Sequence, residues 1–289
     1  MSAIVGGVVA ATSAVVLTAA VPVSAANDAN LVPLQPGRLL DTRSCATCTT
    51  VDGDHAGGGR LAAGRTLTLP VVGRGGVGAD ATAVMLNVTA VAPDAAGYLT
   101  VYPCTPSRPH ASNVNYTAGV VAPNAVLAKL STQGAVCIYT LEATDIVVDV
   151  TGYVPIGGAP VPVEPARLVE TRMGPRNTTV DGAYQRIGRT SARDFVKFKV
   201  VDRGQPNDKV PANAEAVFLN VTAVGPDAAG HLTVYPCTTT VPDVSNVNYG
   251  PGDVVPNAVL APVSPDGHVC IYTHAAADII ADVNGYLPP

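Results

Sequence analysis

Short runs in which apolar and polar residues alternate recur along most of the chain. In residues 83–91, Ala-Val-Met-Leu-Asn-Val-Thr-Ala-Val, every second side chain is apolar and β-branched residues are frequent. This period of two is typical of a strand with one buried face. The same criterion predicts strands at 38–42, 66–72, 98–102, 124–130, 135–141 and 145–154, and later at 167–171, 195–201, 216–224, 231–235, 257–263, 268–273 and 278–287.

Sequences rich in Pro, Gly, Asp and Ser separate these runs, and no long amphipathic helical pattern is present. The chain is therefore expected to be all-β. Seven or eight short strands in about 120 residues predict a β-sandwich, of which a jelly roll is one form. A closed barrel is the alternative.

One stretch occurs twice, nearly letter for letter. Residues 86–104 read LNVTAVAPDAAGYLTVYPC and residues 219–237 read LNVTAVGPDAAGHLTVYPC. The similarity extends without a gap from 85–155 to 218–288, and PGRLLDTR at 36–43 matches PARLVETR at 165–172. A repeat this long exceeds the period of a solenoid, so it indicates two complete domains in tandem.

The repeat sets the expected domain boundaries. Two β-modules are predicted at 31–155 and 165–289, joined by a Pro/Gly-rich linker at 156–164. Residues 1–30 are predicted to be a signal peptide with a short leader. They contain an apolar run that ends in Val23-Ser24-Ala25, a pattern typical of cleavage sites. A transmembrane anchor is the alternative, because the run is long enough to span a bilayer.

Composition narrows the class of protein. The net charge is −5, charged residues make up 13% and hydrophobic residues 47%. This disfavours nucleic acid as a partner, since its binding needs a basic surface. It also disfavours disorder, because the apolar content is sufficient for a packed core.

The six cysteines indicate an oxidising compartment. Cys104 and Cys137 have the same spacing as Cys237 and Cys270, which predicts one disulfide in each module. Cys45 and Cys48 occur only in the first module and are expected to form a small local disulfide. A redox-active site is the alternative for that pair, although no helix-forming sequence follows it.

No catalytic motif is found, and none of the five histidines recurs at an equivalent position in the other module. A duplicated catalytic base would be expected to recur beside its partners, so we do not expect an enzyme. The alternative is an exported hydrolase or inhibitor that uses Asp41, Asp145 and Asp149 or their counterparts.

Charged residues recur in the first and last predicted strands of each module. Asp145 and Asp149 would lie on the same face of their strand, because positions two apart share a face. An arginine of the first strand is expected to pair with a carboxylate of the last. The predicted structural ion pairs use Arg38, Asp41, Arg43 and Asp149, and in the second copy Arg167, Glu170, Arg172 and Asp282.

The repeated SNVNY sequence supplies the candidate ligand platform. Its alternation places the two asparagines on one face, close to a tyrosine. The predicted binding residues are Asn113, Asn115 and Tyr116, with Asn246, Asn248 and Tyr249 in the second copy. The alternative is structural, since asparagines commonly satisfy backbone groups at turns and edges.

No metal site or cofactor is expected. Asp52 and Asp54 suggest calcium, but the second copy has Asp181 followed by Ala183 at the equivalent positions. Two carboxylates fall short of a calcium site by themselves.

Taken together, RLLDTR, LNVT, GYLTVYPC, SNVNY, VCIY and DVxGY resemble an accessory β-module of secreted proteins from high-GC Gram-positive (actinobacterial-type) bacteria. The resemblance implies export and a tandem architecture, and no established ligand. We therefore expect a secreted, non-catalytic protein of the extracellular space or cell surface, acting in cell-surface association, adhesion or glycan binding. Its partner would be a cell-wall or extracellular polysaccharide or a surface protein, with no membrane contact after signal cleavage. A purely structural spacer is a further alternative.

Overall fold

A computed structural model describes Met1 and residues 30–289. The predicted signal peptide therefore lies almost wholly outside the described residues. The described part contains strands and no helix, which confirms the all-β class.

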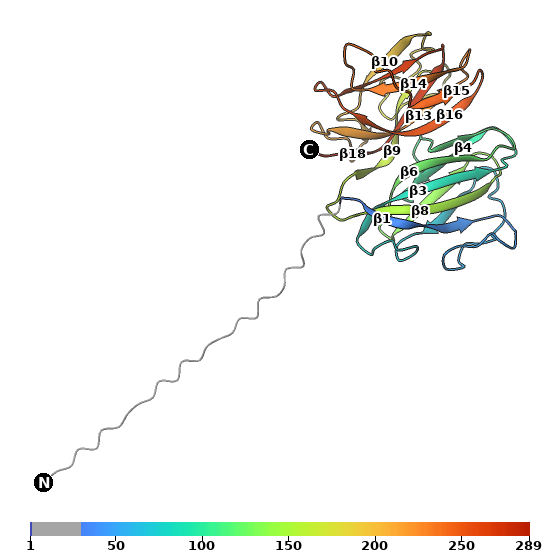
Figure 1. Ribbon diagram of the computed structural model, residues 1–289, viewed down its shortest axis with the longest axis vertical. Coiled ribbons are helices and arrows are strands. Elements are labelled where there is room, and N and C mark those ends of the chain that lie inside the picture. The colour runs from blue at the N-terminus through green and yellow to red at the C-terminus, as the bar shows by residue number, and fades with distance from the viewer. Residues whose placement is uncertain (2–29) are drawn as a thin grey trace.

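Each module is a sandwich of two four-stranded sheets (Figure 1). The strands of the first module are β1 (Val32–Asp41), β2 (Thr66–Pro70), β3 (Ala81–Val91), β4 (Gly97–Tyr102), β5 (Val114–Tyr116), β6 (Ala122–Lys129), β7 (Ala135–Thr140) and β8 (Asp145–Pro155). Its sheets have the orders β1-β8-β3-β6 and β2-β7-β4-β5, with antiparallel pairing throughout. This connectivity is that of an eight-stranded jelly roll.

The second module repeats this arrangement and adds one hairpin. Its strands are β9 (Val161–Glu170), β10 (Asp194–Lys199), β11 (Gly204–Gln205), β12 (Asp208–Lys209), β13 (Ala216–Val224), β14 (Gly230–Tyr235), β15 (Val247–Tyr249), β16 (Val254–Pro262), β17 (His268–Thr273) and β18 (Asp278–Leu287). The sheets are β16-β13-β18-β9 and β10-β17-β14-β15. The extra β11–β12 hairpin has no counterpart in the first module.

Apolar and polar residues alternate along the strands, and this places one face of each sheet in the core of its module. In β3, the even-numbered residues Val84, Leu86 and Val88 are buried, while Asn87 and Thr89 point to the other face and are half-buried. The buried faces of the two sheets of each module form one continuous apolar cluster per module. Burial of these faces is the main stabilising contribution to a sandwich of this kind.

Packing explains why a glycine, Gly97, begins β4 after the repeated turn. A Cβ atom at Gly97 would lie 2.8 Å from the Tyr116 ring, so only glycine fits there. Tyr116 is consequently buried, and its hydroxyl forms a hydrogen bond of 2.8 Å with Thr140 Oγ1. Tyr249 and Thr273 repeat this bond in the second module.

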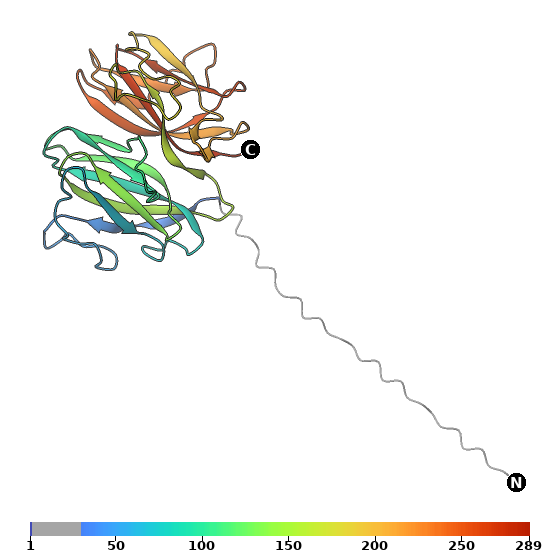
Figure 2. The ribbon, with the colours of Figure 1, turned by 180° about the vertical axis from the view of Figure 1, so that it is seen from behind.

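The two modules pack directly against each other, as the views from both sides show (Figures 1 and 2). The predicted linker at 156–164 is shorter in the structure, because β8 ends at Pro155 and β9 begins at Val161. Strands β6 and β5 of the first module face the sheet of β16, β13, β18 and β9.

Candidate functional site

The repeated arginines and carboxylates lie on the outer face of the sheet that contains the first and last strands of each module. In the first module Arg38 Nε donates to Asp149 Oδ1 at 2.8 Å, and Arg38 and Arg43 both bind the buried carboxylate of Asp41. The hydrogen bond from Arg43, together with the charges of Arg43 and Arg38, holds the pKa of Asp41 below its usual value and outweighs the opposing effect of burial.

The second module repeats the group with Arg167 at its centre. Arg167 Nε donates to Asp282 Oδ1 at 2.8 Å, and Arg167 and Arg172 bind Glu170. Burial alone would lower the pKa of Arg167, but the charges and hydrogen bonds of Asp282 and Glu170 raise it. The structure thus pairs all eight residues for which the sequence predicts structural ion pairs.

The asparagines of the first SNVNY sequence lie between the modules. Asn113 Oδ1 accepts a hydrogen bond from the amide of Val101, and its Nδ2 donates to Asn284 Oδ1 at 3.0 Å. Asn115 Nδ2 donates to Thr222 Oγ1 at 2.8 Å. Both asparagines are buried, so they form no open ligand platform in the first module.

We call the surface of the first module that contacts the second module the docking edge. It lies along β5 and β6 and consists of Ser112, Asn113, Asn115, Asn124 and Leu127. The opposing surface of the second module is the docking face. It lies on the outer side of its larger sheet and consists of Arg167, Asn220, Thr222, Asp282, Asn284 and Gly285.

Several hydrogen bonds connect the docking edge with the docking face. The amide of Ser112 donates to Asp282 Oδ2 at 2.9 Å. Asn124 Nδ2 donates to Asn220 Oδ1 at 2.8 Å, and Asn220 Nδ2 donates to the carbonyl of Ser112 at 2.6 Å. A desolvated network whose members satisfy one another specifies one arrangement of the partners, because any misplaced partner leaves a buried polar group unpaired.

The second SNVNY sequence is placed differently. Asn248 is exposed and Asn246 is half-buried, and Asn246 Oδ1 repeats the bond to a backbone amide, that of Val234. Tyr249 is buried like its counterpart Tyr116. A ligand role for these residues stays a prediction, and only the asparagines of the second module are accessible to one.

A row of aromatic and basic side chains lies on the opposite sheet of each module. In the first module the rings of Tyr98 and Tyr139 are 6.0 Å apart, and the Arg108 guanidinium lies 4.0 Å from the centre of the Tyr139 ring. Arg108 belongs to the 103–113 loop, which the disulfide between Cys104 and Cys137 fastens to β7.

The equivalent row in the second module contains His231, Tyr272 and His274. The ring of His231 lies 6.1 Å from that of Tyr272 and 5.3 Å from that of His274. Phe195 is paired with Tyr272 in the neighbouring strand and is exposed. One signal for this row is present in the sequence, since a change from Tyr98 to His231 between the copies suggests a position outside the core; both side chains are half-buried.

The structure contains all three disulfides predicted from cysteine spacing. They join Cys45 to Cys48, Cys104 to Cys137, and Cys237 to Cys270. Disulfides of this kind fit an oxidising, extracellular environment.

The carboxylates of the alternative hydrolase site are all held by arginines or hydroxyls. Asp41 and Asp149 bind Arg38, and Asp145 binds Arg60 and the hydroxyl of Thr42. For Asp41 this pairing lowers the pKa of the carboxylate, which is unfavourable for a general acid.

Of the two acidic residues of the suggested calcium site, Asp52 is engaged within the protein. Both carboxylate oxygens of Asp52 accept hydrogen bonds from Arg74, at 2.6 and 2.8 Å. In the part of the chain that the structure describes, no three His, Cys, Asp or Glu side chains are grouped to hold a metal ion.

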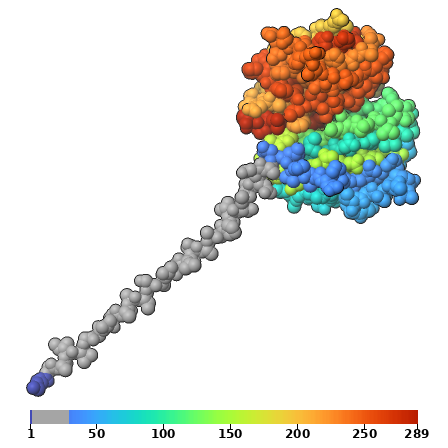
Figure 3. Space-filling view, viewed as in Figure 1, coloured from blue at the N-terminus to red at the C-terminus, as the bar shows by residue number. Residues whose placement is uncertain are grey.

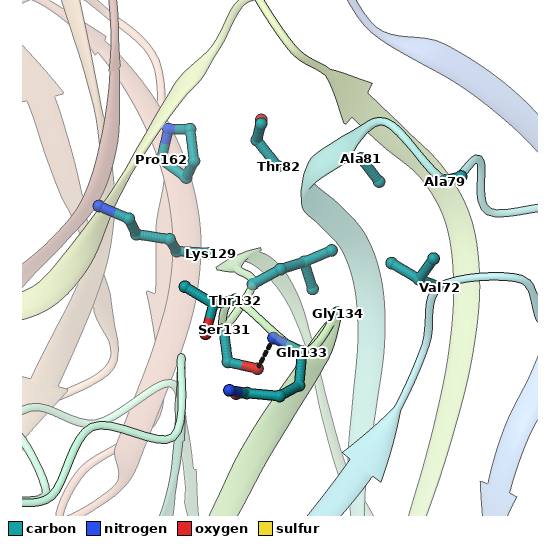
Figure 4. Close-up of a pocket in the computed structure, with 11 residues that line it drawn as sticks. Val72, Ala79, Ala81, Thr82, Lys129, Ser131, Thr132, Gln133, Gly134 and Pro162 are labelled. Carbon is teal, nitrogen blue, oxygen red and sulfur yellow. Dashed lines mark hydrogen bonds between the residues drawn. The ribbon is translucent and has the colours of Figure 1, made fainter.

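A shallow pocket of about 510 Å³ lies at the border of the modules, beside the turn between β6 and β7 (Figure 4). Its wall includes Lys129 and Gln133 of the first module and Pro162 of the second. The Lys129 amine forms an ion pair with Asp208 of the β11–β12 hairpin. The pocket thus adjoins an intermodule contact and brings no candidate catalytic groups together.

Comparison with family models, with curated proteins and with solved structures gives no match for this chain. Within residues 30–289, no helix has the length and apolar character needed to cross a membrane.

Proposed function

We propose that the protein is a secreted, non-catalytic binding protein that attaches to cell surfaces through glycans. The repeated aromatic row supports this proposal most directly. Each module presents an aromatic ring of β7 or β17 beside an aromatic or imidazole ring of β4 or β14, on the outer face of the smaller sheet. Such rings offer flat apolar faces next to polar groups, the combination that binds a sugar ring by stacking and hydrogen bonding.

The two rows differ in chemistry. In the first module the guanidinium of Arg108 lies over Tyr139 and donates a hydrogen bond to the hydroxyl of Tyr98. This site favours a glycan with acidic or strongly polar groups, because a guanidinium offers several donors in a fixed fork. In the second module Val241 takes the place of Arg108, and Phe195 extends the row instead. That site favours a less charged sugar surface.

Two sites on one chain add avidity when both reach the same polymer. We therefore expect binding to an extended wall or extracellular polysaccharide to exceed binding to short oligosaccharides. The disulfides and the apolar amino-terminal run of the sequence support an extracellular location.

The test is a pull-down on purified cell walls and insoluble polysaccharides, accompanied by a glycan array. Tyr139→Ala and Tyr272→Ala are each expected to weaken binding about tenfold, on the scale of one lost aromatic contact. The variant that carries both substitutions is expected to lose polysaccharide binding. Ile187→Asp, at an exposed position that is not part of either row, is the control and should bind like the unaltered chain.

Equal binding by the unaltered chain and the double tyrosine variant would refute the aromatic rows as the site. Absence of binding to every wall and polysaccharide would refute attachment through glycans.

A further inference from the structure

Two histidine rings lie side by side on the outer face of the smaller sheet of the second module. His231 belongs to β14, and His274 directly follows the last residue of β17. Their ring centres are 5.3 Å apart, and the amide of His274 donates to the carbonyl of His231 at 3.0 Å. The pair is therefore fixed across neighbouring strands, although its two residues are far apart in the sequence.

Buried hydrogen bonds hold the turn that carries His274. The amide of Ala275 donates to Tyr249 Oη at 3.2 Å, and Thr273 Oγ1 donates to the carbonyl of Ala275 at 2.6 Å. Tyr249 Oη is also within hydrogen-bond distance, 3.2 Å, of the carbonyl oxygen of His231. One buried tyrosine hydroxyl thus contacts the backbone of both segments, which positions the two histidines before any ligand binds.

Both imidazoles are accessible to a ligand. His274 is exposed and His231 is half-buried. Within residues 30–289, His268 is the one histidine whose ring nitrogen forms a hydrogen bond or ion pair with another residue. The ring nitrogens of His231 and His274 are therefore not engaged by other described side chains.

The spacing of the two rings suits a shared metal ion. Zn²⁺ binds histidine nitrogen at about 2.0–2.1 Å with tetrahedral angles, so two imidazoles that share one ion have ring centres about 5 Å apart. The observed separation is 5.3 Å. The rings are inclined by 30° and stacked, so a nitrogen of each must turn toward the ion. The terminal torsion of histidine is soft, and this adjustment needs no backbone movement.

The first module has the same local backbone and lacks the pair. Tyr98 and Leu141 stand at the equivalent positions, and the amide of Leu141 donates to the carbonyl of Tyr98 at 3.0 Å. The guanidinium of Arg108 lies 5.8 Å from the centre of the Tyr98 ring, where it would repel a cation. Val241 is the counterpart of Arg108, so this repelling charge is not repeated in the second module.

We propose that His231 and His274 bind one divalent transition-metal ion, and that the ring spacing suits Zn²⁺. Imidazole nitrogen is the commonest protein ligand of such ions. Two protein ligands leave coordination positions open, which water or an oxygen atom of a ligand fills. The sequence does not predict this site, because its residues come from two different strands and neither is repeated in the first module.

Isothermal titration of Zn²⁺ into the complete mature chain tests the proposal. The chain carries no polyhistidine tag and is treated with a chelator and dialysed before the titration. One equivalent of Zn²⁺ is expected to bind. Absence of saturable binding would overturn the proposal.

Two substitutions identify the ligands by introducing the residues of the first module. His231→Tyr and His274→Leu change side chains on an outer face and should leave the fold intact. Each is expected to weaken Zn²⁺ binding at least about tenfold, because one of two protein ligands is lost. Unchanged binding in either variant would also overturn the proposal.

Two further variants serve as controls. His55→Asn removes an exposed imidazole of the first module, and asparagine tolerates the left-handed backbone of this position. Tyr272→Ala alters the proposed glycan surface beside the pair. Both chains should still bind one equivalent of Zn²⁺, whereas loss of binding in either would contradict the assignment to the two histidines.

Nuclear magnetic resonance of the imidazole nitrogens gives a readout that does not depend on affinity. The signals of His231 and His274, assigned by their absence in the two variants, should both shift when one equivalent of Zn²⁺ is added. The signal of His55 should not shift. A shift confined to one histidine of the pair would show binding to a single imidazole and would refute a shared ion.

Discussion

At the scale of single residues, the buried carboxylate of Asp41 is the most constrained charge in the first module. It accepts hydrogen bonds from Arg43 and Arg38, and its side chain is fully buried. Repetition of the arginines and carboxylates made these pairs predictable from the sequence. The role of Asn113 and Asn115 was not predictable, because nothing in a strand pattern tells which outer face meets another module.

Acid should destabilise the protein through Asp41. Its pKa is lowered in the folded state from the ordinary value of 3.8, so the stability it contributes is present above that value and is lost as the pH falls through the lower folded pKa. Asp41→Asn should cost about 2 kcal/mol at neutral pH, because it breaks a buried pair whose arginines are partly exposed. It should also flatten the fall in thermal midpoint below about pH 4.

Asp94→Asn is the matched control, since Asp94 pairs with Arg60 at an exposed position. It should change the free energy of unfolding by less than about 1 kcal/mol. Thermal melts between neutral pH and pH 2 measure both effects. An Asp41→Asn melting curve with the same acid dependence as the unaltered chain would count against the assignment.

At the scale of elements, alternation was a sufficient guide to β3, β8 and β18, located only the C-terminal part of β1 and β9, and failed for the short strands. Strands β3, β8 and β18 carry enough alternating residues to be recognised. β5 has three residues, and its pairing depends on Asn113 bonding to the backbone of β4. The β11–β12 hairpin has two residues per strand and arises from the insertion that distinguishes the modules.

The two disulfides of the first module should contribute unequally. Cys104 and Cys137 are separated by 33 residues, Cys45 and Cys48 by 3. In the chain-entropy account the larger loop stabilises by about 4 kcal/mol and the smaller by about 2 kcal/mol. Urea unfolding of the two double alanine variants measures the difference. Equal losses, or a greater loss on removing Cys45 and Cys48, would show that loop closure is not the source of stability.

At the scale of the whole molecule, the repeat predicted two domains, and the structure adds how they are joined. They are in contact along a continuous seam in the space-filling view (Figure 3). The sequence could not reveal this seam, because the residues that make it are the same in the copy that makes no contact. Only the three-dimensional arrangement distinguishes the copy of this surface that contacts the other module from the copy that does not.

The same substitution at the equivalent leucines Leu127 and Leu260 should therefore have unequal effects on stability. Leu127→Asp places a charge in the buried contact with Gly285 and should cost about 3 kcal/mol or separate the unfolding of the two modules. Leu260→Asp should change stability of the single chain by less than about 0.5 kcal/mol, because the side chain is exposed. Calorimetry at low concentration compares them, and equal effects would contradict the asymmetry of the seam.

The two ends of each module lie side by side, with Val32 opposite Tyr153 and Val161 opposite Tyr286. A pulling force applied through these ends loads one end of an antiparallel ladder, so its hydrogen bonds break one pair after another instead of together. Each jelly roll is thus mechanically weak along the chain. The seam between the modules, in contrast, spreads a load over the face of a sheet. Attachment that must withstand flow would depend on lateral contacts, and the covalent chain would act as an extensible tether.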